Sequence, residues 1–173
     1  EKSIRNPLET SKENNMDHNE MHSGCPGSRS MNFAGPAGDG DETGKRPSQL
    51  THWPIQLHLM SPEAPQYQGK DVLLAADCTA FTAGEFHRDF LKGKSLAIAC
   101  PKLDDGQDVY AEKIKALIDD AKINTLTVMI MQVPCCRGLL AVAKEAAGRA
   151  ARKIPIKCIV ISLQGEILSE DWV

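Results

Sequence analysis

The chain has 173 residues, of which 42% are hydrophobic and 25% are charged, a composition typical of one ordinary globular domain. Its net charge of -3 gives no electrostatic reason to expect nucleic acid or an anionic membrane as a partner. No apolar stretch approaches the ~18 residues that a membrane span requires, and the polar start lacks the apolar segment of a secretory signal. We therefore expect a cytoplasmic location. Because the first residue is Glu1, the sequence leaves open whether others precede it, and it leaves the oligomeric state open too.

Residues 1–48 have almost no hydrophobic periodicity and are rich in polar residues and glycine, which predicts an irregular N-terminal segment. This segment contains Cys25 in a loop of glycine and proline, and residues 34–48 are typical of a flexible linker. Residues 49–60 suggest an extended segment that enters the domain, with Pro54 arguing against a central strand. We expect an irregular segment at 1–48 and an α/β domain at 49–173.

Strands and helices are predicted to alternate after Gly69. Apolar runs predict four strands, at residues 72–76, 96–99, 126–132 and 156–163. The spacing of apolar residues between them predicts helices at 84–91, 108–122 and 137–153, and residues 166–173 fit either an edge strand or an unpaired tail. This order predicts a small flavodoxin-like or Rossmann-like three-layer domain with a four-stranded, mainly parallel sheet.

Cysteines follow three of the four predicted strands. Cys78 comes after the first strand, Cys100 after the second, and the pair Cys135 and Cys136 after the third. Because the carboxyl ends of parallel strands share one edge, with neighbours ~4.8 Å apart, these loops can bring the thiols together. Cys158 instead lies inside an apolar strand, where we expect a buried core residue.

Thiols that converge in a cytosolic protein favour metal binding or redox chemistry over disulfides, because that compartment keeps thiols reduced. Four thiolates from separate loops suit a 4Fe-4S cluster, which requires no local CxxC spacing. Pro134 ends regular strand pairing before Cys135 and Cys136, so both thiols can reach one site, and the helix that they open favours an anion. Two alternatives stay open: a zinc site, and a metal-free thiol-redox protein that uses Cys135 and Cys136.

Other polar residues near these loops are secondary candidates. Asp77 could cap or orient its loop through the carboxylate, and His87 could donate a hydrogen bond to sulfur or relay a proton. A histidine in a short helix is more often a surface or capping residue. Asp104 and Asp105 are expected to belong to a solvated loop. No glycine-rich nucleotide fingerprint follows the first strand.

Several motifs, in one order along the chain, are similar to those of a known family. They are Cys25-Pro-Gly-Ser, Gln49-Leu-x-x-Trp-Pro-x-Gln-Leu57, Ala75-Ala-Asp-Cys78-Thr-Ala-Phe, Phe86-His-x-Asp-Phe90, Cys100-Pro-Lys-Leu-Asp-Asp105 and Val133-Pro-Cys-Cys136. Together they resemble a family of iron-sulfur cluster-binding, ferredoxin-annotated proteins of anaerobic prokaryotes, from about Cys25 to Leu168. Members commonly carry an N-terminal two-cluster ferredoxin module, which this chain lacks.

The resemblance implies a 4Fe-4S cluster and electron transfer with a redox partner protein, in an electron-transfer protein rather than a stand-alone enzyme. By matching position, it implies that the cluster ligands come from five cysteines: Cys25, Cys78, Cys100, Cys135 and Cys136. Five exceed the four ligands of one cluster. Either Cys25 caps the site while one of the pair is free, or Cys25 serves a neighbouring site or a partner contact.

Overall fold

A computed structural model of the chain describes residues 31–32 and 46–173. The elements in chain order are β1 (Met31–Asn32), β2 (His52–Trp53), η2 (Pro65–Tyr67), β3 (Asp71–Ala76), α1 (Thr79–Thr82), η3 (Phe86–Leu91), β4 (Ser95–Ala99), α2 (Gln107–Asp119), β5 (Thr125–Met131), η4 (Pro134–Cys136), α3 (Arg137–Arg149), β6 (Ile156–Ile161) and β7 (Ile167–Trp172). Most of the predicted irregular segment at 1–48 lies outside the described residues.

Five strands form the main sheet, in the order β4-β3-β5-β6-β7. Strands β3, β4, β5 and β6 are mutually parallel, and β7 pairs antiparallel with β6. The four predicted strands are therefore confirmed, and β7 adds the fifth strand that the sequence left undecided. From β3 the chain moves outward to β4 and then returns to β5 on the other side. The strand order thus reverses at β3 and β5, the place where α/β sheets of this kind bind ligands.

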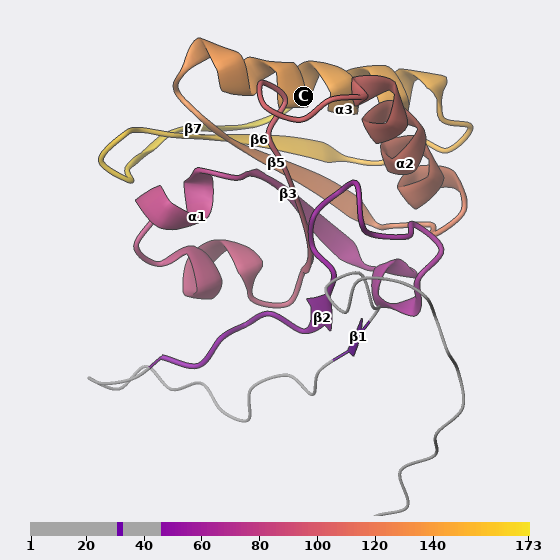
Figure 1. The fold of residues 1–173 in the computed structure, drawn as a ribbon, viewed down its shortest axis with the longest axis horizontal. Coiled ribbons are helices and arrows are strands. Elements are labelled where there is room, and N and C mark those ends of the chain that lie inside the picture. Colours follow the sequence, from indigo (N-terminus) through magenta and orange to yellow (C-terminus); the bar gives the residue numbers. More distant parts are fainter. Residues whose placement is uncertain (1–30, 33–45) are drawn as a thin grey trace, which may run out of the picture.

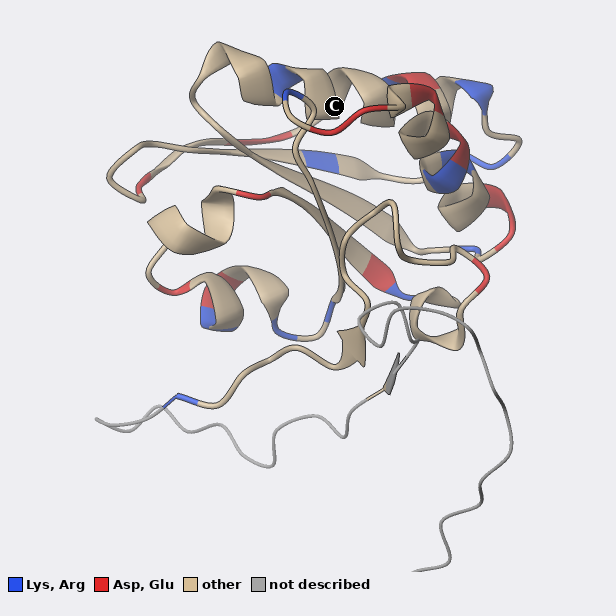
Figure 2. Ribbon diagram, in the orientation of Figure 1, with Lys and Arg blue, Asp and Glu red and all other residues tan. Residues whose placement is uncertain are grey.

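Helices cover both faces of the sheet and make three layers (Figure 1). Helices α2 and α3 pack together on one face, whereas α1 and η3 lie on the other. Right-handed crossovers require this division. The connection from β3 to β4 runs across the sheet in one direction, whereas those from β4 to β5 and from β5 to β6 run in the other, so their helices lie on opposite faces. Figure 2 shows the central strand β5 without charged residues, while α2 and α3 carry charges of both signs.

Apolar side chains fill the space between these layers. The sequence of β5, Thr-Leu-Thr-Val-Met-Ile-Met, is buried from its second residue onward, as expected for a central parallel strand covered on both faces. Helix α2 buries the apolar stripe predicted for it, formed by Tyr110, Ile114, Leu117 and Ile118. No helix within the described ranges has the length and apolar character needed to cross a membrane.

The extended segment before β3 runs along the outer side of β4. The Ile98 N–H donates to the Ile55 carbonyl at 2.8 Å, and the Leu57 N–H donates to the Ile98 carbonyl at 2.9 Å. At the start of β4, the Leu96 N–H donates to Nε2 of the buried His52 at 2.9 Å. The chain therefore covers this edge of its sheet with its own backbone.

Several elements differ from their predicted form: α1 was not predicted, and α2 ends at Asp119, three residues before its predicted end. Residues 86–91 form a π-helix, in which the Lys92 N–H donates to the His87 carbonyl five residues earlier. Its i, i+4 aromatic pair is nevertheless present, with the Phe86 and Phe90 rings 6.4 Å apart. Helix α3 ends at Arg149, four residues before the predicted end. Its end is held by Asp119 of α2, whose carboxylate accepts from the Ala151 and Arg152 N–H groups.

Candidate metal centre

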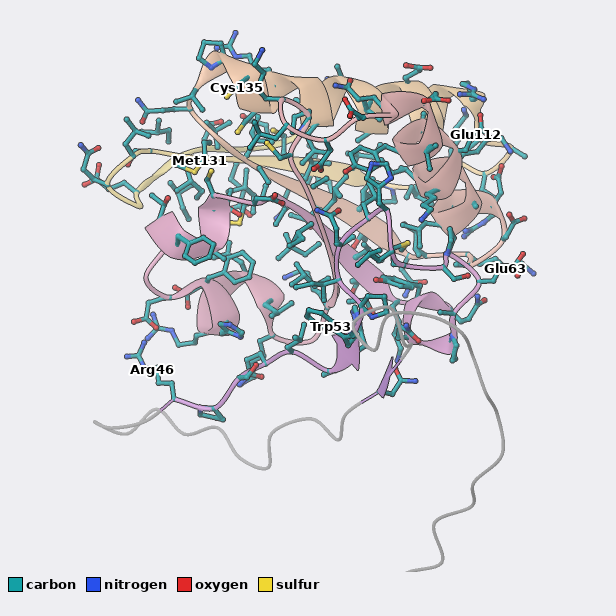
Figure 3. The ribbon with its side chains drawn as sticks, viewed as in Figure 1. Arg46, Trp53, Glu63, Glu112, Met131 and Cys135 are labelled. Atoms are coloured by element: carbon teal, nitrogen blue, oxygen red, sulfur yellow. The ribbon has the colours of Figure 1, made fainter. Side chains whose placement is uncertain are left out.

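Four of the predicted site cysteines lie at one edge of the sheet. Cys78 follows β3, Cys100 follows β4, and Cys135 and Cys136 follow β5. These three strands are parallel neighbours with β3 in the middle, so their carboxyl ends share an edge. This edge includes the point where the strand order reverses. Figure 3 shows sulfur atoms gathered about the labelled Cys135 and Met131, between the start of α3 and α1.

A close contact joins the loop after β4 to the start of α3. A methyl group on the α-carbon of Gly138 would lie 3.2 Å from Cβ of Pro101, closer than nine in ten natural contacts of this kind. Pro101 follows Cys100 directly, and Gly138 lies two residues after Cys136. Strands β4 and β5 are not neighbours, so these two loops meet across the end of β3. Glycine at 138 therefore permits the approach of the Cys100 loop to the cysteine pair.

The cysteine pair lies in the 3-10 turn η4 that joins β5 to α3. Strand β5 ends at Met131 and the turn begins at Pro134, which confirms that regular pairing stops before the cysteines. The Cys136 N–H donates to the Val133 carbonyl at 3.2 Å, and Cys136 is the N-cap residue of α3. The pair is therefore outside the strand geometry that would direct adjacent side chains to opposite faces.

The thiols of this turn interact with each other and with Cys78. Burial raises the pKa of the Cys136 thiol, and a hydrogen bond with Cys135 and the nearby charges of Cys135 and Cys78 raise it further, while a hydrogen bond with the Met131 backbone opposes them. Without a metal ion, Cys136 is consequently protonated at neutral pH. A bound metal ion would reverse this, because it stabilises the thiolate. Three thiols from two loops thus share one electrostatic environment.

Solvent reaches the four thiols unequally. Cys78 and Cys135 are exposed, Cys100 is half-buried, and Cys136 is buried. A group held between them would lie at the protein surface with one side packed against the domain. Such a position suits electron exchange with another protein, which requires a short path from the surface.

The Cys100 loop is held by Asp104, which is half-buried in a loop that is otherwise largely exposed, as predicted. Its Oδ2 accepts a hydrogen bond from the Cys100 N–H at 2.8 Å and another from the hydroxyl of Tyr110. Tyr110 is fully buried, and its pKa is raised by burial, by the hydrogen bond to Asp104, and by the nearby charges of Asp104, Asp77 and Cys100. A signal in the sequence was available, because a tyrosine on the apolar stripe of a helix needs a partner for its hydroxyl.

The two secondary candidates have different positions. Asp77 lies between β3 and Cys78, and burial, followed by the charge of Asp104, raises the pKa of its carboxyl. Its Oδ1 is buried and has no hydrogen-bond partner among the described residues. His87 is exposed in η3, where its Nδ1 accepts a hydrogen bond from the Gln49 N–H at 3.1 Å. His87 therefore holds the segment of residues 49–60 that enters the domain. This is a surface role, as is more common for a histidine in a short helix.

Two further cysteines lie away from the loops described above or outside the described residues. Cys158 is 5% exposed in β6, which confirms the prediction of a core residue. Cys25, the fifth predicted ligand, lies outside the described residues.

The described part of the chain contains no group of three or more His, Cys, Asp or Glu side chains arranged around one metal ion. A single zinc ion draws its thiolates to within about 4 Å of each other, because each Zn–S bond is ~2.3 Å. A cluster binds one thiolate on each of several irons and so spaces its ligands more widely.

Comparison with known proteins supports the fold. Residues 64–173 match the model of a family described as "Rossmann-like domain". The chain is also 27% identical over 121 residues to a protein of Archaeoglobus fulgidus named "Uncharacterized protein", an alignment that covers 69% of this chain and 83% of the archaeal one. No solved structure matches significantly. With most of its length matched by the family model, the chain belongs to the Rossmann-like domain family.

Proposed function

We propose that this protein binds one 4Fe-4S cluster at the carboxyl edge of its sheet and transfers electrons to or from a redox partner protein in the cytoplasm. The observation that supports the proposal best is the common edge reached by three cysteine-bearing loops after the parallel neighbours β4, β3 and β5, with Pro101 of the Cys100 loop packed against Gly138 beside the cysteine pair. The motif resemblance to iron-sulfur proteins of anaerobic prokaryotes points to the same cofactor.

In this proposal, Cys78, Cys100, Cys135 and Cys136 are the ligands that the described chain supplies. The cluster itself would supply one-electron redox chemistry. Asp104 and Tyr110 position the backbone of Cys100 through their shared hydrogen bonds. The packed side of the site, next to the buried Cys136, limits the access of water, and the exposed side at Cys78 and Cys135 faces the partner. Burial and hydrogen bonds to sulfur then set the reduction potential.

Five candidate ligands leave two arrangements for one cluster. In the first, the four described cysteines bind it and Cys25 serves a neighbouring site or a partner contact. In the second, Cys25 replaces one member of the pair, and the exposed Cys135 is then the member left free, because Cys136 is held against the domain. Removal of Cys25 distinguishes the two arrangements, since only the second loses a ligand.

A metal-free thiol-redox protein is the second candidate function, and the position of Cys135 and Cys136 side by side in the turn η4 favours it. In that chemistry two thiols become a disulfide and release two protons and two electrons to an oxidised substrate. The raised pKa of Cys136 argues against a fast thiolate nucleophile at this position, although Cys135 is exposed and accessible.

Metal and sulfide content after anaerobic purification tests the proposal. We expect about four irons and four acid-labile sulfides per chain, with broad visible absorption that reduction bleaches. Cys78→Ser should lower the iron content strongly, whereas Cys158→Ala, the matched control in the core, should retain it. Zinc without iron would replace the proposal with a zinc site. A chain free of metal, with a reversible disulfide between Cys135 and Cys136, would favour the thiol-redox function.

A further inference from the structure

The last strand of the sheet exposes an unusual share of the apolar surface. Nine large hydrophobic side chains are exposed among the described residues, and four of them lie within residues 167–173. These four are 48% to 62% exposed, and they are Ile167, Leu168, Trp172 and Val173. Apolar side chains gathered on one strand indicate a contact surface more often than scattered ones do.

The two edges of the sheet differ in their protection. Residues 55–57 cover the outer side of β4 with backbone hydrogen bonds. At the opposite edge, β7 pairs with β6 and with no other described strand. Edge strands are usually protected by charged side chains, proline, a bulge or a covering segment. The six residues Ile167–Trp172 include neither proline nor lysine, and their protection is limited to Glu170, Asp171 and one irregularity in the β6–β7 register at Val160/Ile161.

Alternation along the ladder identifies the free backbone groups of β7. The Val173 N–H donates to the Ile156 carbonyl at 2.9 Å, and the register places Asp171 opposite Cys158 and Ser169 opposite Val160. In an antiparallel pair, alternate residues bond the same neighbour. Ser169 and Asp171 therefore bond β6, while the N–H and C=O groups of Glu170 and Trp172 point away from the sheet.

We propose that β7 pairs antiparallel with β7 of a second copy of this chain, so that two five-stranded sheets join into one across a two-fold axis. Antiparallel self-pairing brings the Trp172 end of each strand to the Ile167 and Leu168 end of the other, which buries the apolar side chains of both. The centre of the paired β7 strands is acidic. In each copy, however, Lys157 Nζ lies 2.6 Å from Glu170 Oε1 and 4.8 Å from the Trp172 ring centroid. Each copy thus carries its own compensating cation beside the axis.

Sedimentation velocity of the full chain over a range of concentrations tests this interface. The wild-type chain should sediment as a dimer. Glu170→Pro removes an outward N–H without removing a bond to β6, so it should raise the dimer dissociation constant at least ~10-fold. Glu170→Ala, the matched control, loses the same ion pair and keeps the N–H, and it should remain dimeric. Trp172→Lys is a second disrupting variant that leaves the backbone intact, and circular dichroism verifies the fold of each variant.

Hydrogen exchange gives an independent readout at single amides. In the dimer, the Glu170 and Trp172 amides should exchange slowly, and dilution to the monomer should make them fast while Ser169 and Asp171 stay protected. A wild-type chain that remains monomeric at all concentrations would overturn the proposal. So would dimers that persist in both Glu170→Pro and Trp172→Lys, or slow exchange of the Glu170 and Trp172 amides in a monomer, which would show that another segment of the same chain covers the edge.

Discussion

Substitution of Gly138 by alanine tests the contact that brings the cysteine loops together. In a helix, glycine to alanine normally stabilises by about 0.5–1 kcal/mol, because alanine loses less conformational entropy. At position 138 the added methyl lies 3.2 Å from Cβ and 3.6 Å from Cγ of Pro101, so the loop after Cys100 must move by a few tenths of an ångström. Crowding of this kind costs about 1 kcal/mol. We therefore expect Gly138→Ala to leave the free energy of unfolding nearly unchanged.

The same helix offers a matched control. A methyl group at Gly148 of α3 would meet nothing within 4 Å, so Gly148→Ala should show the helix gain alone. The difference between the two variants, about 1 kcal/mol in denaturant unfolding of the metal-free chain, measures the Pro101 contact. Gly138→Leu should displace Pro101 altogether and lower the iron content as well. Equal stabilisation by Gly138→Ala and Gly148→Ala would refute this account of the two loops.

Three further predictions concern the framework of the site. Gly165→Ala should destabilise the fold by roughly 2–4 kcal/mol, since Gly165 has φ +89° and its methyl would lie 2.4 Å from the Thr82 carbonyl oxygen at the end of α1. Lys113→Met should cost about 1–3 kcal/mol, because the Lys113 ammonium donates hydrogen bonds to three backbone carbonyls of residues 57–60. Burial lowers the pKa of His52 below 6.5, so the folded state resists its protonation and stability should fall as the pH drops below 6.5, a slope that His52→Gln should reduce.

Each of these predictions has a control. Gly69→Ala tests the effect of a positive φ without a clash, because Gly69 has φ +62° and no atom lies within 4 Å of the added methyl. Gly69→Ala should therefore destabilise the fold less than Gly165→Ala does. Lys115→Met removes a partly exposed ion pair with Asp119 and should cost under about 1 kcal/mol. If Lys113→Met destabilised the fold no more than Lys115→Met does, the result would contradict a structural role for the three carbonyl contacts. If His52→Gln left the dependence of folding stability on pH unchanged, that dependence would come from other groups.

The parallel part of the sheet was predictable because its strands are uninterrupted apolar runs. The run before Cys78 and the run before Pro134 can be buried only in a strand covered on both faces, and β3 and β5 are so covered. Strand β7 was not decided by its sequence. Its residues Ser169, Glu170 and Asp171 interrupt the apolar pattern, because an edge strand has little of its surface in the core.

The grouping of Cys78, Cys100 and the cysteine pair at one edge was also predictable, since it follows from parallel strands alone. The support for the Cys100 loop was predictable only in part, because the sequence shows that the Tyr110 hydroxyl needs a partner but does not identify that partner. Asp104 in the sequence looks like any loop aspartate, and only the fold shows that Tyr110 on the next helix is turned toward it. Contacts of this kind depend on how a helix docks on the sheet, which spacing in the sequence does not specify.

Alkylation of each cysteine, followed by mass spectrometry, tests the central claim most directly. The iron-loaded chain and the same chain after chelation are compared under reducing, anaerobic conditions, with the buried Cys158 as an internal control that stays unreactive in both. We expect Cys78, Cys100 and at least one of Cys135 and Cys136 to be protected together when iron is bound and to become reactive together when it is removed. Independent reactivity of these thiols, unchanged by iron, would contradict a shared centre.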